Sequence, residues 1–379
     1  MNFELSEEQL LIQAMVKEFA ASDIAPIAAK IDSDHRFPAE LLAPMAKLNL
    51  MGVPFPEEVG GAGADNVSYA IVLEELARAC ASTSVIVSAH TSLCTWPIFE
   101  FGTPEQKAKY VTGLASGELL GAFALTEPNA GTDAAAGTAT AVLDGDEYVL
   151  NGSKIFITNG GFADVYIVTA MTDPAAGTRG ISAFIVDKDA PGFTVGEREH
   201  KMGIKASSTT PLYFSDCRIP KENLLGQAGK GFKIAMQTLD GGRIGVAAQA
   251  LGIAQAALDA SVAYAKERVQ FGKPIATLQA IQWMIADMAV EVDAARLLVY
   301  RAAWNKDNGL PYTKEAAMAK LFAAEVATRV AGKAIQIHGG YGFTESYSVE
   351  RNYRDAKITE LYEGTSEVQR MVIAGATLR

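Results

Sequence analysis

The feature that most constrains the fold is the order in which the hydrophobic pattern changes along the chain. Up to about residue 120, apolar residues recur at helical spacing. From Gly121 to about Pro220, short β-rich runs are broken by turn residues. Beyond Gly231 the chain returns to long, alanine-rich helical runs. Because helices and strands do not alternate, the pattern argues against a doubly wound nucleotide-binding sheet and predicts a mainly helical protein with one β-domain.

This pattern divides the chain into a helical domain 1–120, a β-domain 121–228 and a helical domain 229–379. Ser6 and Gln9 form a capping-box signature that opens the first helix. The predicted helices are 7–21, 38–48, 67–80, 84–100, 104–116, 243–268, 279–306, 313–337 and 366–377. The predicted strands are a hairpin of 138–143 and 147–150, followed by 155–158, 165–171 and 181–186.

Composition and charge exclude several function classes. The 33 Lys and Arg residues against 44 Asp and Glu leave a net charge of −11, which repels a phosphate backbone, so nucleic acid is not an expected partner. Three widely spaced cysteines and four scattered histidines indicate neither a disulfide framework nor a metal site. No run of about 18 apolar residues is present and the first residues are acidic, so we expect no membrane-spanning helix, no signal or transit peptide, and a cytoplasmic protein.

Two glycine-rich stretches, 61–66 and 340–345, resemble phosphate-binding loops only superficially. Each has the first two glycines of G-x-G-x-x-G and lacks the third, and no predicted strand precedes either one. Gly339, Gly340 and Gly342 follow a predicted helix, and this is more glycine than a helix end requires. It suggests a backbone in close approach to something flat. His338 alone is expected to be a capping or packed imidazole.

A polar loop, LTEPNAGTD at 125–133, lies where helix gives way to strand. Its composition fits either a capped, solvated loop, which is the commoner case, or a rigid loop that offers N–H and O–H groups to a heteroaromatic ring or a phosphate. Downstream, Asn151-Gly152 and Asn159-Gly160 predict two tight turns around a short strand. Phe156 in that strand is expected in the core, with a stacking platform as the alternative.

Two acidic residues each have a structural and a functional interpretation. Asp240 is expected to cap or open the long helix and to pair with Arg243 at i, i+3; alternatively, Arg243 and the helix N-terminus meet a carboxyl, phosphate or amide of a ligand. Glu363 precedes a helix that Thr365 or Ser366 caps. It is either a solvated loop glutamate or a carboxylate held in an apolar pocket, where a raised pKa makes it a competent general base.

Six ordered blocks together resemble the acyl-CoA dehydrogenases, over essentially the whole chain. They are PEEVGG at 56–61, LTEPNAGTD at 125–133, GSKIFITN at 152–159, RVQFGKP at 268–274, HGGYG at 338–342 and YEGTSE at 362–367. The segment TLDGGRIGVAAQALG at 238–252 looks most like the bacterial short-chain, or butyryl-CoA, dehydrogenases. The resemblance implies an N-terminal helical domain, a middle β-barrel-like domain and a C-terminal four-helix bundle, assembled as a homotetramer.

The resemblance also implies an FAD site between the β-domain and the bundle that reaches a neighbouring subunit. The residues expected around the isoalloxazine ring and ribityl chain are Phe123, Leu125, Thr126, Gly131, Thr132, Phe156, Ile157 and Thr158. The residues expected from the adjoining subunit, at the pyrophosphate and adenosine, are Arg268, Phe271, Gln279, Gln336, Gly339 and Gly340. Thr365 and Glu367 are expected beside the flavin. The residues expected to contact acyl-CoA are Thr132, Asp240, Arg243, Tyr362 and Gly364.

The reaction that the resemblance implies removes an α-proton from a thioester and moves a hydride from the β-carbon to flavin N5. Glu363 is then the base, and its backbone N–H, with a flavin ribityl hydroxyl, stabilises the developing enolate oxygen. Some relatives place the base immediately before the arginine of the long helix. Here that position is Gly242, which has no side chain to titrate, so the expectation rests on Glu363. Electrons are expected to pass to electron-transferring flavoprotein.

A short, straight-chain acyl-CoA is the expected substrate. A glutaryl-specific relative needs a cation near 84–99, and His90 is the only basic residue there. Trp96 and Phe99 either shorten the acyl pocket or are core aromatics. The alternatives are a dehydrogenase for branched-chain, dicarboxylyl or cyclic acyl-CoA, a flavin-free acyl-CoA-binding protein, and an acyl-CoA oxidase. The oxidase is less expected because that class generally carries a longer C-terminal extension.

Overall fold

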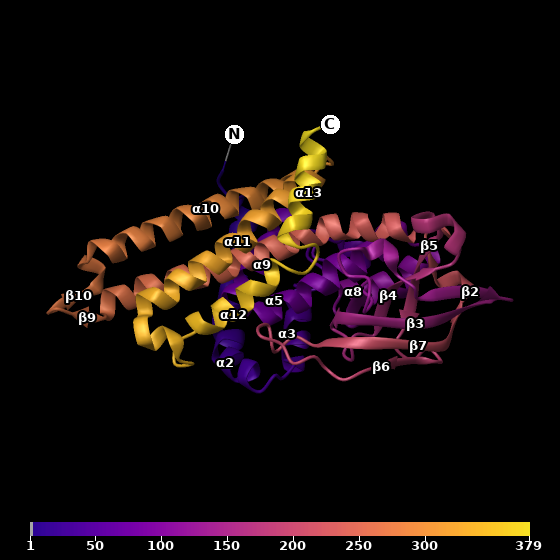
Figure 1. The fold of residues 1–379 in the computed structure, drawn as a ribbon, viewed down its shortest axis with the longest axis horizontal. Helices are drawn as coiled ribbons and strands as arrows, with labels where there is room; N and C mark the ends of the chain where they lie inside the picture. Colours follow the sequence, from indigo (N-terminus) through magenta and orange to yellow (C-terminus); the bar gives the residue numbers. More distant parts are fainter. Residues whose placement is uncertain (1–2) are drawn as a thin grey trace.

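A computed structural model describes residues 3–379 and places the N-terminal helices against a long helical bundle (Figure 1). The predicted capping box of Ser6 and Gln9 is present. The N-terminal helices are α1 (Glu7–Phe19), α2 (Ala25–Ser33), α3 (Leu42–Lys47), α4 (Asn66–Ala79), α5 (Ala81–Ser88), α6 (Trp96–Phe101), α7 (Pro104–Gln106) and α8 (Thr112–Ala115). The predicted helix 84–100 is therefore not one regular helix, because a π-helical segment, Ala89–Thr95, separates α5 from α6.

The strand-rich part lies at one end of the molecule (Figure 1). Its strands are β1 (Gly121–Ala124), β2 (Thr140–Asp144), β3 (Glu147–Thr158), β4 (Val165–Met171), β5 (Ile181–Asp187), β6 (Phe193–Val195), β7 (Thr209–Pro220) and β8 (Leu224–Leu225). Within residues 3–379 they form a mixed sheet in the order β6-β7-β3-β2-β4-β5-β8, with β1 paired in parallel to β4. Tyr166, Phe184 and Phe214 lie in the apolar core of this sheet.

The C-terminal part is a bundle built around one central helix. Its elements are α9 (Gly231–Glu267), the ribbon of β9 (Val269–Gln270) and β10 (Lys273–Pro274), α10 (Gln279–Asp307), α11 (Thr313–His338), α12 (Val349–Thr359) and α13 (Ser366–Thr377). α9 packs against α4, α10 and α11. A Cβ at Gly252 would lie 2.2 Å from the carbonyl oxygen of Glu74, so glycine permits the close contact of α9 with α4.

The central helix α9 is long and apolar enough to cross a membrane, by length and composition alone. The sequence led us to expect no such helix. Most of the apolar stretch is buried inside the molecule, as is usual for the core helix of a bundle. Its apolarity is therefore explained by packing against α4, α10 and α11.

The structure confirms a mainly helical chain with one sheet-containing part, but the helix-start prediction at Asp240 is wrong. Asp240 lies inside α9, which begins nine residues earlier at Gly231. The apolar residues Ile234 and Ala235 are buried and extend the helical pattern upstream, and packing offsets the low helix propensity of the glycine pair that follows Asp240. No helix N-terminus is therefore available to a ligand at Arg243.

The predicted turn at Asn151-Gly152 is also wrong, because β3 runs unbroken through it. The register between β3 and β7 shifts at this point, so the glycine forms a bulge; its φ is +136°. The strands β1, β6, β7, β8, β9 and β10 and the helix α12 were not predicted. β7 contains Pro211 and ends at Pro220, and proline suppresses the usual strand signal.

Candidate functional site

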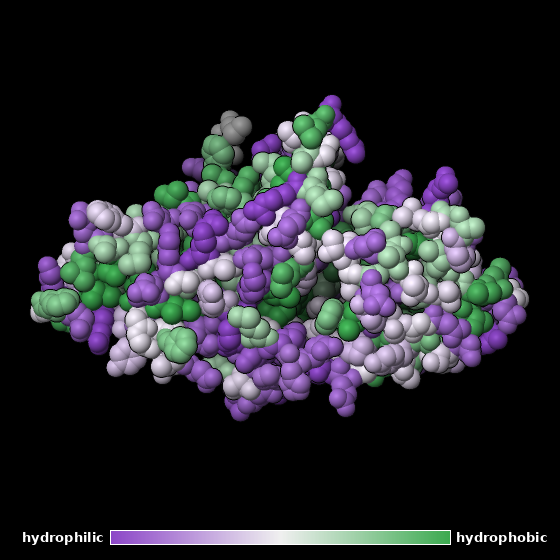
Figure 2. Space-filling view, in the orientation of Figure 1, coloured by the Kyte–Doolittle hydropathy of each residue, from purple (hydrophilic) through white to green (hydrophobic). Residues whose placement is uncertain are grey.

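A cavity of about 790 Å³ lies where α9, the strand-rich part and the segment before α13 meet. In the view of Figure 2, the surface is hollowed between the helical and strand-rich parts. Leu93 from the π-helical segment, with Met236 and Leu239 from α9, gives the cavity apolar walls. Threonine hydroxyls and backbone from the loop that follows β1 and from the last residues of β3 line another part of it. A large apolar cavity with a few polar groups is the usual form of a small-molecule site.

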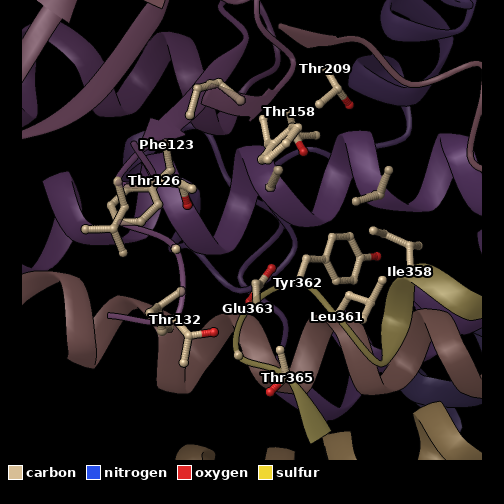
Figure 3. Close-up of a pocket in the computed structure, with 18 of the residues that line it drawn as sticks. Phe123, Thr126, Thr132, Thr158, Thr209, Ile358, Leu361, Tyr362, Glu363 and Thr365 are labelled. Carbon is tan, nitrogen blue, oxygen red and sulfur yellow. The ribbon is translucent and has the colours of Figure 1, made fainter. Parts of the chain in front are cut away.

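Most residues predicted for the flavin and the substrate line this cavity. They are Phe123, Leu125, Thr126, Gly131, Thr132, Phe156, Ile157, Thr158, Arg243, Tyr362, Glu363, Gly364 and Thr365. Figure 3 shows Glu363 near the centre, with Thr132 and Tyr362 on either side of it in this view. Asp240 and Glu367 do not belong to the lining: Asp240 is bonded to Arg243, and Glu367 is exposed in the first turn of α13.

Glu363 presents an unpaired carboxylate to the cavity. Its Oε2 is buried and has no hydrogen-bond partner among residues 3–379. Burial raises the pKa of Glu363 to about 7, against the opposing charges of Lys320 and Arg243. The oxygen occupies space that a side chain at Gly242 would fill, since a Cβ there would lie 2.1 Å from Oε2. A buried carboxylate with a near-neutral pKa has the properties of a general base.

Arg243 lies beside this carboxylate, and its Nη1 has a hydrogen-bond partner whereas its Nε has none among the described residues. Its Nη1 donates to Oδ1 of Asp240 at 2.6 Å, and Oδ2 of Asp240 accepts from Thr313 at 2.7 Å. The Nε of Arg243 is buried and has no partner in the described part of the chain. Because a buried donor without an acceptor is costly, this nitrogen marks a place where a ligand acceptor fits.

A buried ion pair between Lys154 and Glu127 supports the loop 125–133. Nζ of Lys154 lies 2.8 Å from Oε1 of Glu127 and donates to the carbonyl of Leu125 at 3.0 Å. The Glu127 carboxylate also accepts from the backbone N–H groups of Thr138 and Ala139. The loop therefore has a rigid support, and its residues 125, 126, 131 and 132 line the cavity.

Phe156 is not in the core, so the default prediction for this residue is wrong. Its side chain is 59% exposed and its φ is +60°. The cause is a second irregularity in the register of β3 with β7, between Lys154 and Ile157. The irregularity turns the phenyl ring toward the cavity, which it lines. This geometry matches the alternative interpretation, a stacking platform.

The residues predicted to contact FAD from an adjoining subunit lie at the other end of the bundle, near β9 and β10 (Figure 1). A pocket of about 550 Å³ there is lined by Arg268, Phe271, Gly339 and Gly340. Gln279 and Gln336 are not in its lining, although their chain neighbours at 278 and 337 are. Within one chain, the two predicted groups of cofactor residues therefore lie apart from each other.

His338 beside this second pocket is a packed imidazole, as expected. It is buried and stacks on Tyr264 with ring centroids 4.2 Å apart. Its Nδ1 lies 2.8 Å from the carbonyl oxygen of Ala334. Throughout residues 3–379, no three His, Cys, Asp or Glu side chains are grouped as a metal site.

His90, the only basic residue in 84–99, does not face the cavity. It is fully buried, its Nε2 lies 2.9 Å from the carbonyl oxygen of Leu114, and its Nδ1 accepts from the N–H of Gly121. Burial lowers the pKa of His90 to about 4, so the ring is neutral. Trp96 and Phe99 do not line the cavity either and pack against Phe101 and Phe55, respectively.

Sequence reasoning missed several residues of the cavity. The loop residues 199–204 line it, but they carry no regular pattern from which a site could be inferred. Leu93, Met236 and Leu239 are apolar residues on helical segments, and their spacing is the same as that of core residues. Lys320, which acts on Glu363 from α11, carried no distinguishing signal, because it is one of three lysines in the predicted helix 313–337.

Comparisons with known proteins agree over the full length of the chain. Acyl-CoA dehydrogenase family models match residues 6–118 (N-terminal domain), 122–217 (middle domain) and 229–378 (C-terminal domain). A short-chain-specific acyl-CoA dehydrogenase of Clostridium acetobutylicum is 58% identical, with all of both chains covered. The butyryl-CoA dehydrogenase structure from Megasphaera elsdenii is 52% identical with a TM-score of 0.99, again covering all of both chains. A chain from a structure of the electron transferring flavoprotein of Acidaminococcus fermentans, studied for flavin-based electron bifurcation, is 55% identical with a TM-score of 0.99 and the same full coverage.

Proposed function

The chain belongs to the acyl-CoA dehydrogenase family, and from this premise we propose that it oxidises a short-chain acyl-CoA to the trans-2-enoyl-CoA with FAD as cofactor. The reaction takes a proton from the α-carbon and a hydride from the β-carbon. It therefore needs a base, a two-electron acceptor and a donor for the thioester oxygen. The observation that carries the proposal is the unpaired carboxylate of Glu363 in the cavity.

Glu363 is suited to remove the α-proton. With a pKa of about 7, about half of this side chain is deprotonated at neutral pH, and Oε2 has no competing partner in residues 3–379. The apolar walls formed by Leu93, Met236 and Leu239 limit the access of water to the carboxylate. We assign the backbone N–H of Glu363 to the thioester oxygen, where negative charge develops as the proton leaves.

The residues of the cavity fit FAD. Phe156 offers an exposed aromatic face, and the loop 125–132 and Thr158 offer hydroxyl and backbone donors on a rigid support. Thr365 lines the cavity below Glu363 in the view of Figure 3. We propose that these residues hold the ring and ribityl portion of the cofactor. When bound, FAD supplies the acceptor for the hydride that leaves the β-carbon.

We further propose a homotetramer in which the second pocket of one subunit contributes to the cavity of its neighbour. The separation of Arg268, Phe271, Gly339 and Gly340 from the main cavity supports this arrangement. A second support is an exposed apolar row on α10 with a seven-residue spacing, which is the pattern of a helix–helix seam. The row consists of Trp283, Val290, Leu297 and Trp304, which are 62%, 69%, 48% and 53% exposed.

A short, unbranched acyl group is the substrate that we favour. The specificity of the Clostridium relative supports it. A dicarboxylyl substrate is disfavoured because His90, the one basic residue in 84–99, is neutral and bonded to backbone at both ring nitrogens. We propose electron-transferring flavoprotein as the acceptor of the electrons, because of the likeness to the Acidaminococcus chain. We also propose that the protein is cytoplasmic.

The test begins with the visible spectrum of the purified protein, because a colourless protein that takes up no FAD on reconstitution excludes dehydrogenation. Anaerobic reduction of the flavin by straight, branched, cyclic and dicarboxylyl acyl-CoAs then ranks the substrates, and we expect butyryl-CoA to be fastest. Glu363→Gln should retain FAD and bind butyryl-CoA without bleaching the flavin; normal bleaching would move the base elsewhere. Rapid oxygen consumption with butyryl-CoA would indicate an oxidase.

A further inference from the structure

The turn at Glu363-Gly364 rests on a lysine that is buried inside the bundle. Lys320 lies in α11 and is fully buried, and its Nζ donates to the carbonyl oxygen of Gly364 at 2.7 Å. The neighbouring residues Ala319 and Ala323 are also fully buried. An ammonium group in such surroundings is costly to bury, so its place beneath this turn calls for a reason other than packing.

A second buried side chain holds the same turn without carrying a charge. Nε2 of Gln369, in α13, donates to the carbonyl oxygens of Glu363 at 3.2 Å and Gly364 at 2.9 Å. The turn has positive φ at both residues, +51° and +95°. A glutamate adopts this conformation only where its surroundings impose it. Lys320 and Gln369 therefore share the task of fixing the turn, but only Lys320 brings a positive charge.

The charged and titratable groups that face Glu363 come from several elements. α9 contributes Arg243, α11 contributes Lys320, α4 contributes Tyr69, and Tyr362 precedes the carboxylate in its own segment. Burial raises the pKa of both tyrosines well above neutrality, so they carry no charge there.

The two cations differ in how far they are neutralised. The charge of Arg243 is matched by Asp240 at 2.6 Å, whereas Lys320 forms no ion pair within 4.0 Å in the described residues. Glu360 and Glu367 act on Lys320 from a greater distance. The charge of Lys320 is therefore the less compensated of the two cations that act on Glu363.

We propose that Lys320 is a positioning residue for the base: it fixes the 363–364 turn and, by its charge, keeps the Glu363 carboxylate ionised near neutral pH. The inference rests on the proposed function, in which Glu363 takes the substrate proton. Burial lowers the pKa of Lys320 to about 8, and burial raises the pKa of Glu363 to about 7. Between these two values the ammonium and the carboxylate are both charged, which is the state that the reaction needs.

The experiment compares Lys320→Met with Gln369→Leu, because both remove a donor to the same turn and only the first removes a charge. Each variant is prepared with FAD, and its flavin content and Tm are measured. The rate of anaerobic flavin reduction by butyryl-CoA is followed from pH 5.5 to 9. The carboxylic acid stretching band of Glu363, identified by its loss in Glu363→Gln, is titrated by infrared spectroscopy on the same proteins.

In Lys320→Met we expect the acid limb of the rate profile and the infrared titration both to move up by about one pH unit, as for loss of an opposite charge nearby. At pH 6 the rate then falls about tenfold beyond the pH-independent loss that removal of a turn donor causes, and at pH 8.5 it falls less than twofold beyond that loss. Lys320→Arg should leave the acid limb of the rate profile at the wild-type pH. Gln369→Leu should lower the rate at all pH values without shifting the acid limb. An infrared titration of Lys320→Met that coincides with wild type overturns the inference.

The two proposals fail in different ways. If Glu363→Gln still reduces the flavin, the assignment of the base is lost, while the infrared titration still reports whether Lys320 sets the ionisation of Glu363. If Lys320→Met does not fold, Lys320→Gln and Lys320→Arg carry the comparison, because both retain a donor to Gly364 and they differ in charge.

Discussion

The space that Gly242 leaves for Glu363 leads to a sharp prediction for Gly242→Ala. The added Cβ would lie 2.1 Å from Oε2 of Glu363 and 2.7 Å from Leu93, and real Cβ contacts essentially never fall below 3.0 Å. The carboxylate oxygen must therefore retreat by about 0.9 Å, the difference between these limits. A misplacement of about 1 Å in a reacting group costs about 100-fold in rate, which corresponds to about 2.7 kcal/mol of activation free energy.

The neighbouring glycine supplies a matched control. A Cβ at Gly241 meets only Nζ of Lys306, at 3.4 Å, and both glycines lie inside α9, where alanine is the better helix former by about 1 kcal/mol. We expect Gly241→Ala to reduce the flavin at close to the wild-type rate and Gly242→Ala to be about 100-fold slower, measured anaerobically by stopped flow with equal flavin content. Equal rates in the two variants would refute the assigned position of the carboxylate.

Three further outcomes are expected. Lys154→Met leaves Glu127 buried without its cation and should lower the free energy of unfolding by about 3–5 kcal/mol; denaturant unfolding measures this, and adding Glu127→Gln should restore part of it. Burial raises the pKa of Asp355 from 3.8 to about 6, so the folded state binds a proton at this carboxyl more tightly than the unfolded state does. Protonated Asp355 therefore stabilises the fold at low pH, and this stabilisation is lost as pH rises through about 6. Asp355→Asn should reduce the dependence of Tm on pH in this range. Trp283→Glu places a charge in the exposed apolar row of α10 and should yield smaller species in light scattering, with weaker FAD retention; an unchanged mass would argue against that seam.

Elements with strong local signals could be predicted closely from the sequence. The strand 165–171 is apolar except for Thr169, and the helix 366–377 begins at a threonine cap; both have the predicted bounds in the structure. The start of α9 was missed because Gly241 and Gly242 resemble a helix break, whereas packing against Glu363 and Leu93 is what accounts for Gly242. Local pattern therefore failed where a long-range contact determines the residue.

The candidate site was predictable mainly through the order of its motifs. Phe156 was placed in the core as the default for an aromatic residue in a strand, because nothing in the sequence reports the register shift that turns it outward. Lys320 could not be assigned, since a lysine on a helix is normally solvent-facing and only its contact with Gly364, 44 residues away, gives it a role. The raised pKa of Glu363 likewise depends on groups brought together by folding.

The length of α9 also has a consequence for how the molecule can change. Arg243 at the main cavity and Glu267, the chain neighbour of Arg268 in the second pocket, are on the same helix, 24 residues and thus about 36 Å apart along its axis. Inserting one residue between them would rotate one end by about 100° relative to the other, whereas seven would nearly restore the original direction. The number of residues in this stretch therefore sets how the two pockets face each other, and a single inserted residue there should disturb both pockets more than a substitution of an exposed residue.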